Sequence, residues 1–263
     1  MPSLAIAANP PATSTAAPDY ELQLGPEFLG EIKGTAAVSA AGNATYTIPL
    51  ELPPGTAGMR PSLSFQYNSN MKNGLLGVGW FLQGATSKIT RCAQNLSQDG
   101  VIKQVQLNSD DKFCLDGQRL VVVNGGTYGA SGTEYGTEID SILRVTSYGQ
   151  APGTDSGPLY FEVESPNGRT SYYGNTNDSL IEAQGKDAIA TWALNRVEDE
   201  YRNYYEIIYE ENNAQGAYQV EKIEYTGNLN KSMNPSVTIE FGYESRPDHQ
   251  FFYRAGAKMR EYQ

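Results

Sequence analysis

Two glutamates separated by one residue, Glu162 and Glu164, are the side chains in this sequence that most resemble a catalytic pair. Arg144 and the Thr-Ser dipeptide at 146–147 precede them, in the order that ADP-ribosyl transfer requires: an arginine for the dinucleotide, a hydroxyl-bearing strand and a Glu-x-Glu pair. These residues lie within about twenty positions, too few for separate strands to converge on a cleft. We therefore expect both glutamates on the solvent face of a strand over 159–165, and a transferase is a distant alternative.

The remaining candidates for catalysis are weaker. The single histidine, His249, follows Arg-Pro-Asp in a turn-like segment, and we expect it at the surface and not in a Ser-His-Asp triad. The 30 acidic residues offer many carboxylate pairs, but none stands out as a glycosidase pair. Glycine-rich stretches such as 125–132 lack the spacing of nucleotide-binding loops. We expect no catalytic residue and no enzyme activity.

Metal and cofactor sites are also not expected. Cys92 and Cys114 are the only cysteines, and one histidine beside them is too few for a zinc cluster. We expect two ordinary thiols, with a disulfide left open because spacing alone cannot place their Cβ atoms. Residues 175–179 carry oxygen ligands at alternate positions, but the glycine of a calcium loop is missing.

Charge and hydropathy exclude two classes of partner. The chain has 263 residues and a net charge of −11, from 19 basic and 30 acidic side chains, which disfavours nucleic acid and anionic lipid. No run is long and apolar enough to span a bilayer, so we expect no direct membrane insertion. The first residues lack the basic region and apolar core of a recognisable signal peptide.

The elements that position these residues are predicted to be strands. The chain contains 27 Gly, 14 Pro and 18 Tyr, a composition typical of turns and half-buried sheets. Leu63, Phe65 and Tyr67 alternate with polar residues, and residues 237–243 alternate in the same way. Asn-Gly at 167–168 predicts a hairpin. Residues 187–200 could form a helix by propensity, but we favour a strand there. An antiparallel all-β fold is expected.

Three parts are expected along the chain. Residues 1–25 have the Ala, Pro, Ser and Thr composition of a disordered tail. Residues 26–150 form a first β-rich part, with candidate strands at 101–107, 112–115 and 120–123. Residues 151–263 form a second β-rich part that ends without a cap, as a truncated sequence would.

Residues 42–91 carry a family resemblance. The segment runs through Pro-Pro-Gly at 53–55, a Phe-Gln-Tyr-Asn-Ser strand at 65–69 and Gly-Val-Gly-Trp at 77–80. This pattern resembles the SpvB-type amino-terminal domain found in B components of insecticidal toxin complexes and in YD-repeat (Rhs-like) toxins. Further matches include Asp-Lys-Phe-Cys-Leu-Asp-Gly at 111–117 and Thr-Trp-Ala-Leu at 191–194. Arg202 stands where that pattern usually has glycine, so the turn there is expected to differ.

The resemblance implies a secreted bacterial virulence toxin in which this domain helps to form a β-sheet shell around a carboxy-terminal effector. The implied partners are other domains of the same chain, an effector-carrying component and a pore-forming translocation subunit. We expect no catalytic residues and a core built on six aromatic side chains: Phe65, Tyr67, Trp80, Phe113, Trp192 and Phe241. The alternative is a stand-alone adhesive or glycan-binding β-module, which the many tyrosines would suit.

Overall fold

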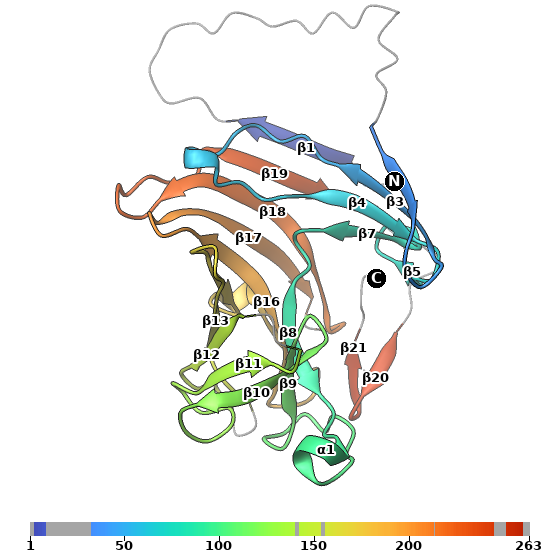
Figure 1. Cartoon of the computed structure of the whole chain (residues 1–263), viewed down its shortest axis with the longest axis vertical. Coiled ribbons are helices and arrows are strands. Elements are labelled where there is room, and N and C mark those ends of the chain that lie inside the picture. Colours follow the sequence, from blue (N-terminus) through green and yellow to red (C-terminus); the bar gives the residue numbers. More distant parts are fainter. Residues whose placement is uncertain are drawn as a thin grey trace, which may run out of the picture.

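The computed structural model describes residues 3–8, 33–139, 142–153, 156–212, 214–244 and 251–259. This part of the chain is nearly all β, and its paired strands run antiparallel, as the sequence predicts. It falls into two regions, a barrel below and a two-layer slab above (Figure 1). No helix in the described ranges has the length and apolar character needed to cross a membrane.

The barrel is formed by eight of the described strands, which close into a ring. Closure depends on β8, which pairs with β9 on one side and with β16 on the other. Thr90 lies opposite Thr191, so the ring joins residues about one hundred positions apart in the sequence. The strands are β8 (Lys88–Cys92), β9 (Lys112–Leu115), β10 (Gln118–Asn124), β11 (Glu134–Thr137), β12 (Arg144–Tyr148), β13 (Tyr160–Glu164), β14 (Thr170–Tyr173) and β16 (Ile189–Glu198).

Aromatic rings fill the interior of the barrel. Trp192 is fully buried, and its ring lies edge-on to Phe113 and to Phe161, with centroids 5.3 Å away in both cases. Gly174 adopts a φ of +73°, and a Cβ there would meet the Trp192 ring at 2.4 Å. The indole therefore occupies the space that a side chain at 174 would need. An eight-stranded barrel is just wide enough for side chains to fill it.

Strand β16 connects the barrel to the slab. Its first half pairs with β8 and with β15 (Leu180–Glu182), whereas residues 196–198 pair with β17. The sheet thus leaves the barrel and continues as an open wall in the order β16, β17 (Asn203–Asn212), β18 (Ala217–Asn228), β19 (Val237–Gly242) and β1 (Ser3–Ala8).

A second sheet of four strands packs on this wall and completes the slab (Figure 1). Leu63 and Leu82 share a buried cluster with Ile239 of the wall. The connection around η1 (Thr56–Gly58) crosses β18, where the Tyr225 hydroxyl donates a hydrogen bond to the Pro53 carbonyl at 3.0 Å. The four strands are β2 (Thr35–Val38), β3 (Ala44–Pro49), β4 (Ser64–Asn68) and β7 (Trp80–Gln83).

Small elements complete the description. The hairpin of β20 (Phe252–Arg254) and β21 (Ala257–Met259) forms a separate apolar cluster with Leu107 and Ala190. A second hairpin, β5 (Asn73–Gly74) with β6 (Gly77–Val78), precedes β7. One turn of helix, α1 (Leu96–Asp99), lies at the lower end of the barrel, and η2 (Asn177–Ser179) precedes β15.

Several expectations about elements are confirmed. The alternating segments form β4 and β19, and Gly168, at φ +78°, closes the hairpin between β13 and β14. The ambiguous segment 187–200 contains strand β16, because its apolar residues pack into the barrel and override helix propensity. The strand expected at 101–107 is wrong: this segment is loop, and Leu107 adopts a left-handed φ of +58°.

The expectation of two thiols is also wrong. Cys92 of β8 and Cys114 of β9 form a disulfide, with their Cα atoms 5.9 Å apart, because the two strands are neighbours in the barrel. The boundary expected near residue 150 falls between β12 and β13, which pair side by side. Within the expected tail, residues 3–8 form β1, and residues 9–25 lie outside the described ranges.

Candidate interaction surface

The segment 93–111, which connects β8 to β9, is bound by two buried arginines of the barrel, and we call it the anchored loop. It contains α1, whose N-cap Asn95 accepts a hydrogen bond from the Gln98 amide at 2.9 Å. Gly100 ends the helix in the left-handed conformation, at φ +69°. Asn at the N-cap and Gly just after the last helical residue are favourable choices because they satisfy the free backbone groups of a helix.

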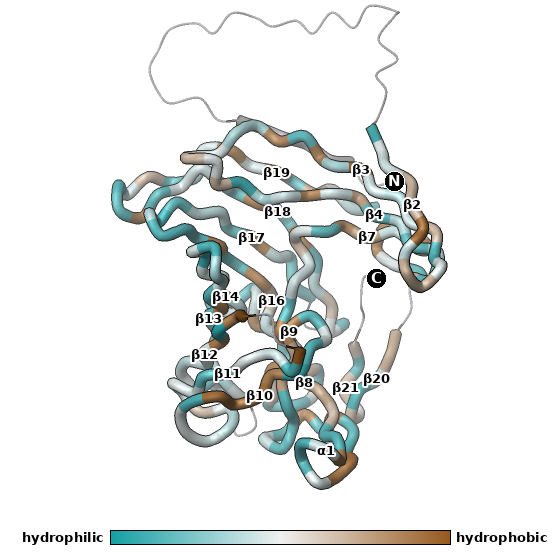
Figure 2. Tube along the Cα trace, in the orientation of Figure 1, coloured by the Kyte–Doolittle hydropathy of each residue, from teal (hydrophilic) through white to brown (hydrophobic). Residues whose placement is uncertain are grey.

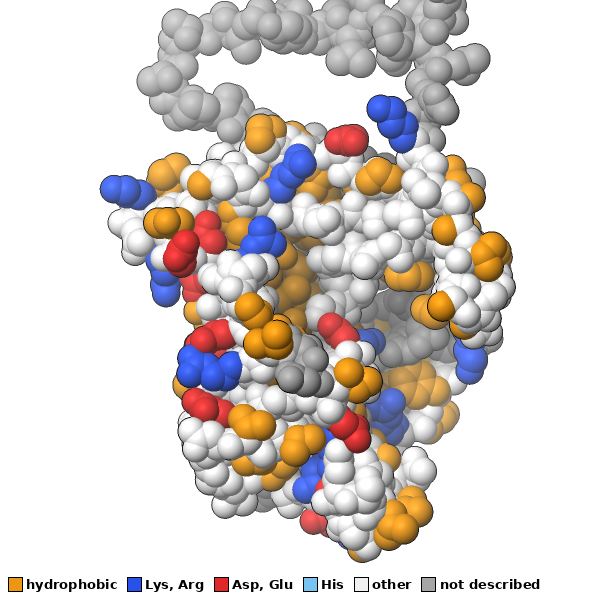
Figure 3. Space-filling model, in the orientation of Figure 1, with side chains coloured by type: hydrophobic (Ala, Val, Ile, Leu, Met, Phe, Trp, Pro, Cys, Tyr) orange, Lys and Arg blue, Asp and Glu red, His pale blue; other side chains and the backbone are white. Residues whose placement is uncertain are grey.

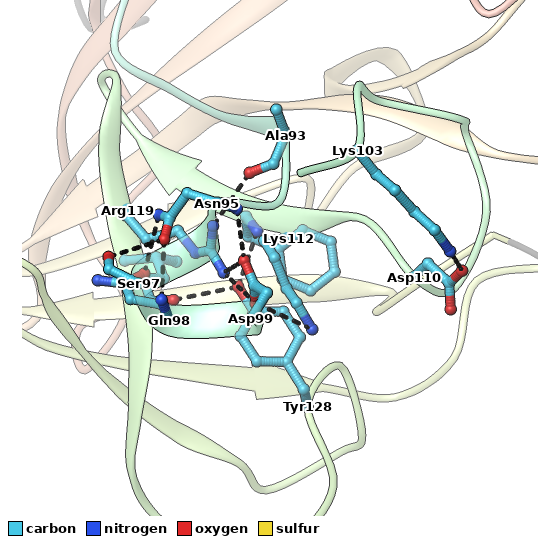
Figure 4. Close-up of polar contacts among 12 residues, drawn as sticks. Ala93, Asn95, Ser97, Gln98, Asp99, Lys103, Asp110, Lys112, Arg119 and Tyr128 are labelled. Atoms are coloured by element: carbon cyan, nitrogen blue, oxygen red, sulfur yellow. Dashed lines mark hydrogen bonds and ion pairs between the residues drawn. The ribbon is translucent and has the colours of Figure 1, made fainter. Parts of the chain in front are cut away.

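A buried ion pair ties α1 to the barrel (Figure 4). The Arg119 guanidinium of β10 donates from one nitrogen to both carboxylate oxygens of Asp99, at 2.8 Å each, and both side chains are 8% exposed. Burial raises the pKa of the Asp99 carboxyl, but hydrogen bonds from Arg119 and the Asn95 amide outweigh it and leave that pKa lowered. Asp99 is therefore a charged structural anchor.

Neighbouring side chains extend this anchor. Arg119 also donates to the Ala93 carbonyl at 3.0 Å, which fixes the start of the anchored loop. The Lys112 ammonium lies 3.9 Å from Asp99 and 4.4 Å from the centroid of the Tyr128 ring, a cation–π contact (Figure 4). The Tyr128 hydroxyl accepts from the Phe113 amide and donates to the Leu120 carbonyl, so the group joins β9 to β10.

A second buried arginine holds the other end of the anchored loop. Arg91 of β8 is 3% exposed and donates to the carbonyls of Asn108, Ser156 and Ile189. Its guanidinium also lies 3.4 Å from Asp111, whose carboxylate accepts from the Gln106 and Asn108 amides. Because a buried charge needs both a counter-charge and hydrogen bonds, this arrangement is structural.

The anchored loop exposes apolar side chains despite this rigid support. Leu96, Val101 and Ile102 are 65%, 43% and 74% exposed. Figures 2 and 3 show hydrophobic residues over this loop at the lower end of the molecule. Lys103 and Asp110 pair with each other at 3.0 Å on the same loop. A fixed apolar tip with paired charges can contact another protein surface, but it offers no group for catalysis.

The six aromatic residues expected in the core lie in two environments. Phe113 and Trp192 are buried in the barrel. Phe65 and Phe241 are half-buried and pack against the main apolar cluster in the slab. Tyr67 and Trp80 are half-buried neighbours at one end of the four-stranded sheet, with ring centroids 5.5 Å apart.

Four of the candidate transferase residues lie on the outer face of the barrel, whereas Ser147 is fully buried and its hydroxyl lies 3.3 Å from the Tyr135 hydroxyl. Arg144 is opposite Glu164 and binds it at 2.6 Å, while Thr146 is opposite Glu162. Arg144, Thr146, Glu162 and Glu164 thus lie on one face of two adjacent strands, β12 and β13. Asp178, from the calcium-like segment, accepts from the Tyr209 amide at 2.8 Å. The described residues contain no group of three or more His, Cys, Asp or Glu placed to hold a metal ion, and His249 lies outside the described residues.

Sequence reasoning missed the residues that build this surface. Asp99, Arg119 and Arg91 are charged, and a charged residue in a polar-looking loop is ordinarily read as solvent-exposed. The spacing of Asn95 and Gly100 around a four-residue helix was a readable signal, because it marks both helix ends. The ion pairs themselves depend on contacts of the anchored loop with strands β8 and β10, which no local pattern reveals.

Comparison with known proteins gives matches in sequence and in structure. The family model described as Salmonella virulence plasmid 65kDa B protein matches residues 38–263. The crystal structure of TcdB2-TccC3 is similar, with a TM-score of 0.66 and 16% identity, over 87% of this chain and 13% of that chain. Among curated proteins no match is found.

Two further solved structures share the fold. The N-terminal domain of effector protein SpvB from Salmonella typhimurium strain LT2 has a TM-score of 0.60 and 22% identity, over 81% of this chain and 83% of that chain. The Tc holotoxin pore of Photorhabdus luminescens has a TM-score of 0.62 and 17% identity, over 86% of this chain and 13% of that chain. This chain thus spans a small part of the toxin chains that it matches.

Proposed function

The chain belongs to the SpvB family, and from this premise we propose that it is a non-catalytic structural domain of a secreted bacterial toxin. In this proposal it contributes to a β-sheet shell that encloses a carboxy-terminal effector. Its partners are the other domains of the same toxin chain, an effector-carrying component and a pore-forming translocation subunit. The solved structures with the same fold support the toxin context, since their titles name toxin complexes and an effector protein.

The observation that carries this proposal is the filled interior of the barrel. Eight-stranded barrels can hold a small ligand when their interior is left open. Here Trp192, Phe161 and Tyr135 are fully buried inside the ring and occupy its centre. A barrel whose centre is filled by its own side chains is a packed core and not a ligand cavity, which suits a supporting part of a larger assembly.

The charged residues support the same reading. Arg91 and Arg119 each donate hydrogen bonds to backbone carbonyls, and each forms an ion pair with a buried carboxylate from another segment of the chain. On the outer face, Arg144 lies between Glu164 at 2.6 Å and Glu134 at 3.7 Å. An arginine that already bridges two strands of the barrel is poorly placed to grip a dinucleotide, so the residues of the transferase alternative serve the sheet instead.

The open wall of the slab supports a continuation into neighbouring protein. In the described part of the chain, β1 pairs with β19 alone and β2 pairs with β3 alone, so each forms the edge of its sheet. All four residues of β2 are exposed. Edge strands offer free backbone groups that pair readily with a further strand. Two sheets that each end in an edge strand with free backbone groups are consistent with a domain that forms part of a larger shell.

A second candidate function, glycan binding, is supported by one pair of stacked tyrosine rings. Tyr148 of β12 and Tyr160 of β13 lie opposite each other on the outer face and stack at 5.0 Å, with 15° between their planes. Both are half-exposed, and a flat aromatic surface of this kind can stack on a sugar ring. Binding of soluble oligosaccharides that is lost in a Tyr148→Ala, Tyr160→Ala double variant would favour this candidate.

The two candidates are separated by the size of the native protein. An antibody against this chain should detect, in the source cells, a protein far larger than 28.7 kDa, and limited proteolysis of it should leave a protected carboxy-terminal fragment. A band at 28.7 kDa would contradict the shell proposal and leave the stand-alone module as the better account.

A further inference from the structure

The disulfide between Cys92 and Cys114 lies at the strand that closes the barrel. Cys92 is the last residue of β8, and Cys114 lies within β9, 22 positions further along the sequence. The anchored loop is the connection between these two strands, so the disulfide closes its base. Because β9 pairs with β10 at two positions only, Gln118 with Leu115 and Arg119 with Cys114, this covalent link reinforces a short strand.

The two sulfurs differ in access. Cys114 is 7% exposed, whereas Cys92 is half-exposed and lines a pocket of about 520 Å³. The β20–β21 hairpin also lines this pocket, through Tyr253 and Arg254. A small thiol can therefore approach the Cys92 side of the disulfide, while the barrel wall shields Cys114.

The charge of the pocket favours an anionic thiol. Arg254 lines the pocket, so its guanidinium places a positive charge there, although the protein as a whole carries a net charge of −11. Arg91 also lines the pocket, but its guanidinium is held by Asp111 and by backbone carbonyls. A thiolate is the reactive form in disulfide exchange, and a nearby cation stabilises it.

We propose that Cys92 is a thiol-exchange site for small anionic thiols, of which glutathione is the probe. The thiolate attacks Cys92 Sγ, the S–S bond breaks, and Cys114 leaves as a thiolate that takes a proton from water. Cys92 remains in a mixed disulfide with the probe. A second probe thiolate attacks the probe's own sulfur, which releases Cys92 and forms the oxidised probe. The two electrons that reduce the disulfide come from the two probe thiols.

The effect of exchange is local. The β8–β9 backbone pairs from Ile89–Leu115 to Cys92–Lys112 remain, and the Asp99–Arg119 ion pair still holds α1. The base of the anchored loop, however, loses its covalent closure. Exchange thus loosens the base of the segment that presents Leu96, Val101 and Ile102, so the apolar tip is held most firmly in the oxidised protein.

Glutathione treatment of the native, oxidised chain tests this proposal. Peptide mapping by mass spectrometry should find the adduct on Cys92 and not on Cys114. Amide hydrogen exchange should rise within 93–111, and full reduction should lower the Tm by roughly 5–10 °C. A Cys92→Ser, Cys114→Ser double variant is the matched control, and neither its exchange rates nor its Tm should respond to glutathione.

The Arg254→Gln variant tests the role of the pocket. It should form the adduct with anionic glutathione roughly threefold to tenfold more slowly, because local attraction is lost, while its rate with neutral mercaptoethanol should not change. An adduct mainly on Cys114 would overturn the proposal. It would equally be overturned by exchange that needs denaturant, or by two free thiols in the untreated protein.

Discussion

The two tryptophans of the chain show how differently the barrel and the slab are built. Trp192 is fully buried and meets Phe113 and Phe161 edge-on in the barrel. Trp80, on the four-stranded sheet of the slab, is half-exposed and contacts the rings of Tyr46 and Tyr67. A closed sheet surrounds an aromatic side chain with strands on all sides. Two stacked open sheets cover it from one side only, and rings near their ends stay partly in water.

The ion pairs differ in the same way. In the barrel, Asp99 and Arg119 are both buried and tie together distant parts of the chain. On the slab, Lys222 and Glu224 lie two residues apart on one strand and are about one-third exposed. The barrel therefore contains a buried ion pair as well as exposed ones such as Arg144 with Glu164, while the slab presents this ion pair and its sheet edges to the outside. The comparison indicates a self-contained barrel that carries a slab suited to contact with neighbours.

The largest expected effect is a difference in unfolding free energy between alanine variants of the two tryptophans. Trp192→Ala removes the ring that fills the barrel, and we expect a loss of about 4 kcal/mol of unfolding free energy. Trp80→Ala removes a half-exposed ring and should cost about 1–2 kcal/mol. Urea unfolding followed by circular dichroism measures both. Equal losses in the two variants would break the distinction between the barrel and the slab.

The buried ion pair should give the next largest effect. Arg119→Met leaves the Asp99 carboxylate buried without its main partner, and we expect a loss of about 3 kcal/mol. Arg144→Met is the matched control, because Arg144 forms its ion pairs on the exposed outer face of the same barrel, and this variant should lose much less stability than Arg119→Met. If the control cost as much as Arg119→Met, burial would not be the source of the stabilisation.

The turn between β16 and β17 offers a smaller effect. Arg202 adopts a φ of +67°, the left-handed conformation that glycine takes most readily, and its Nε lies 3.3 Å from the buried Glu198 carboxylate. Both Arg202→Gly and Arg202→Ala lose this contact, but only the alanine keeps the backbone strain. The glycine variant should therefore be more stable than the alanine variant by about 1 kcal/mol. Equal Tm values would show that the turn relaxes in both.

The smallest expected effect is a pH dependence at one end of the slab. Burial, together with the neighbouring carboxylates of Glu182 and Asp178, raises the pKa of Glu211 to about 8. The folded protein therefore holds a proton that the unfolded chain releases. This stabilisation is complete below the ordinary pKa of 4.5 and is lost as the pH rises through about 8.

Because Glu211 is partly exposed, solvent screening limits the effect to about 1 kcal/mol. Urea midpoints at pH 5 and pH 9 should differ more in the wild type than in Glu211→Gln. Glu210→Gln, on the opposite side of the same strand, serves as the control and should behave like the wild type. A Glu211→Gln variant with the full wild-type pH dependence would contradict this assignment.

Much of the fold could be read from local patterns. Alternation at Leu63, Phe65 and Tyr67 located β4, and the Asn-Gly turn at 167–168 located the hairpin of β13 and β14. The closure of the barrel could not be read, because β8 and β16 are far apart in the sequence and their pairing is set by packing around Trp192. The disulfide could not be read either, because it depends on β8 and β9 lying side by side at the base of the anchored loop.

The candidate surface was less predictable than the fold. Exposed apolar residues such as Val101 and Ile102 look in sequence like part of a buried strand, and this produced the wrong strand at 101–107. Buried charges such as Arg91 look like surface residues. In both cases the sequence shows residue type, whereas the role depends on partners that only the folded chain supplies.

Hydrogen exchange of this chain, alone and within the longer toxin chain that we propose as its native context, tests the central claim most directly. We predict that the barrel strands, such as β13 and β14, are equally protected in both. The edge strands β1 and β2 should exchange quickly in the isolated chain and gain protection in the native protein, where neighbouring segments cover them. Equal protection of β1 and β2 in both forms would contradict the claim that the slab is an open piece of a larger shell.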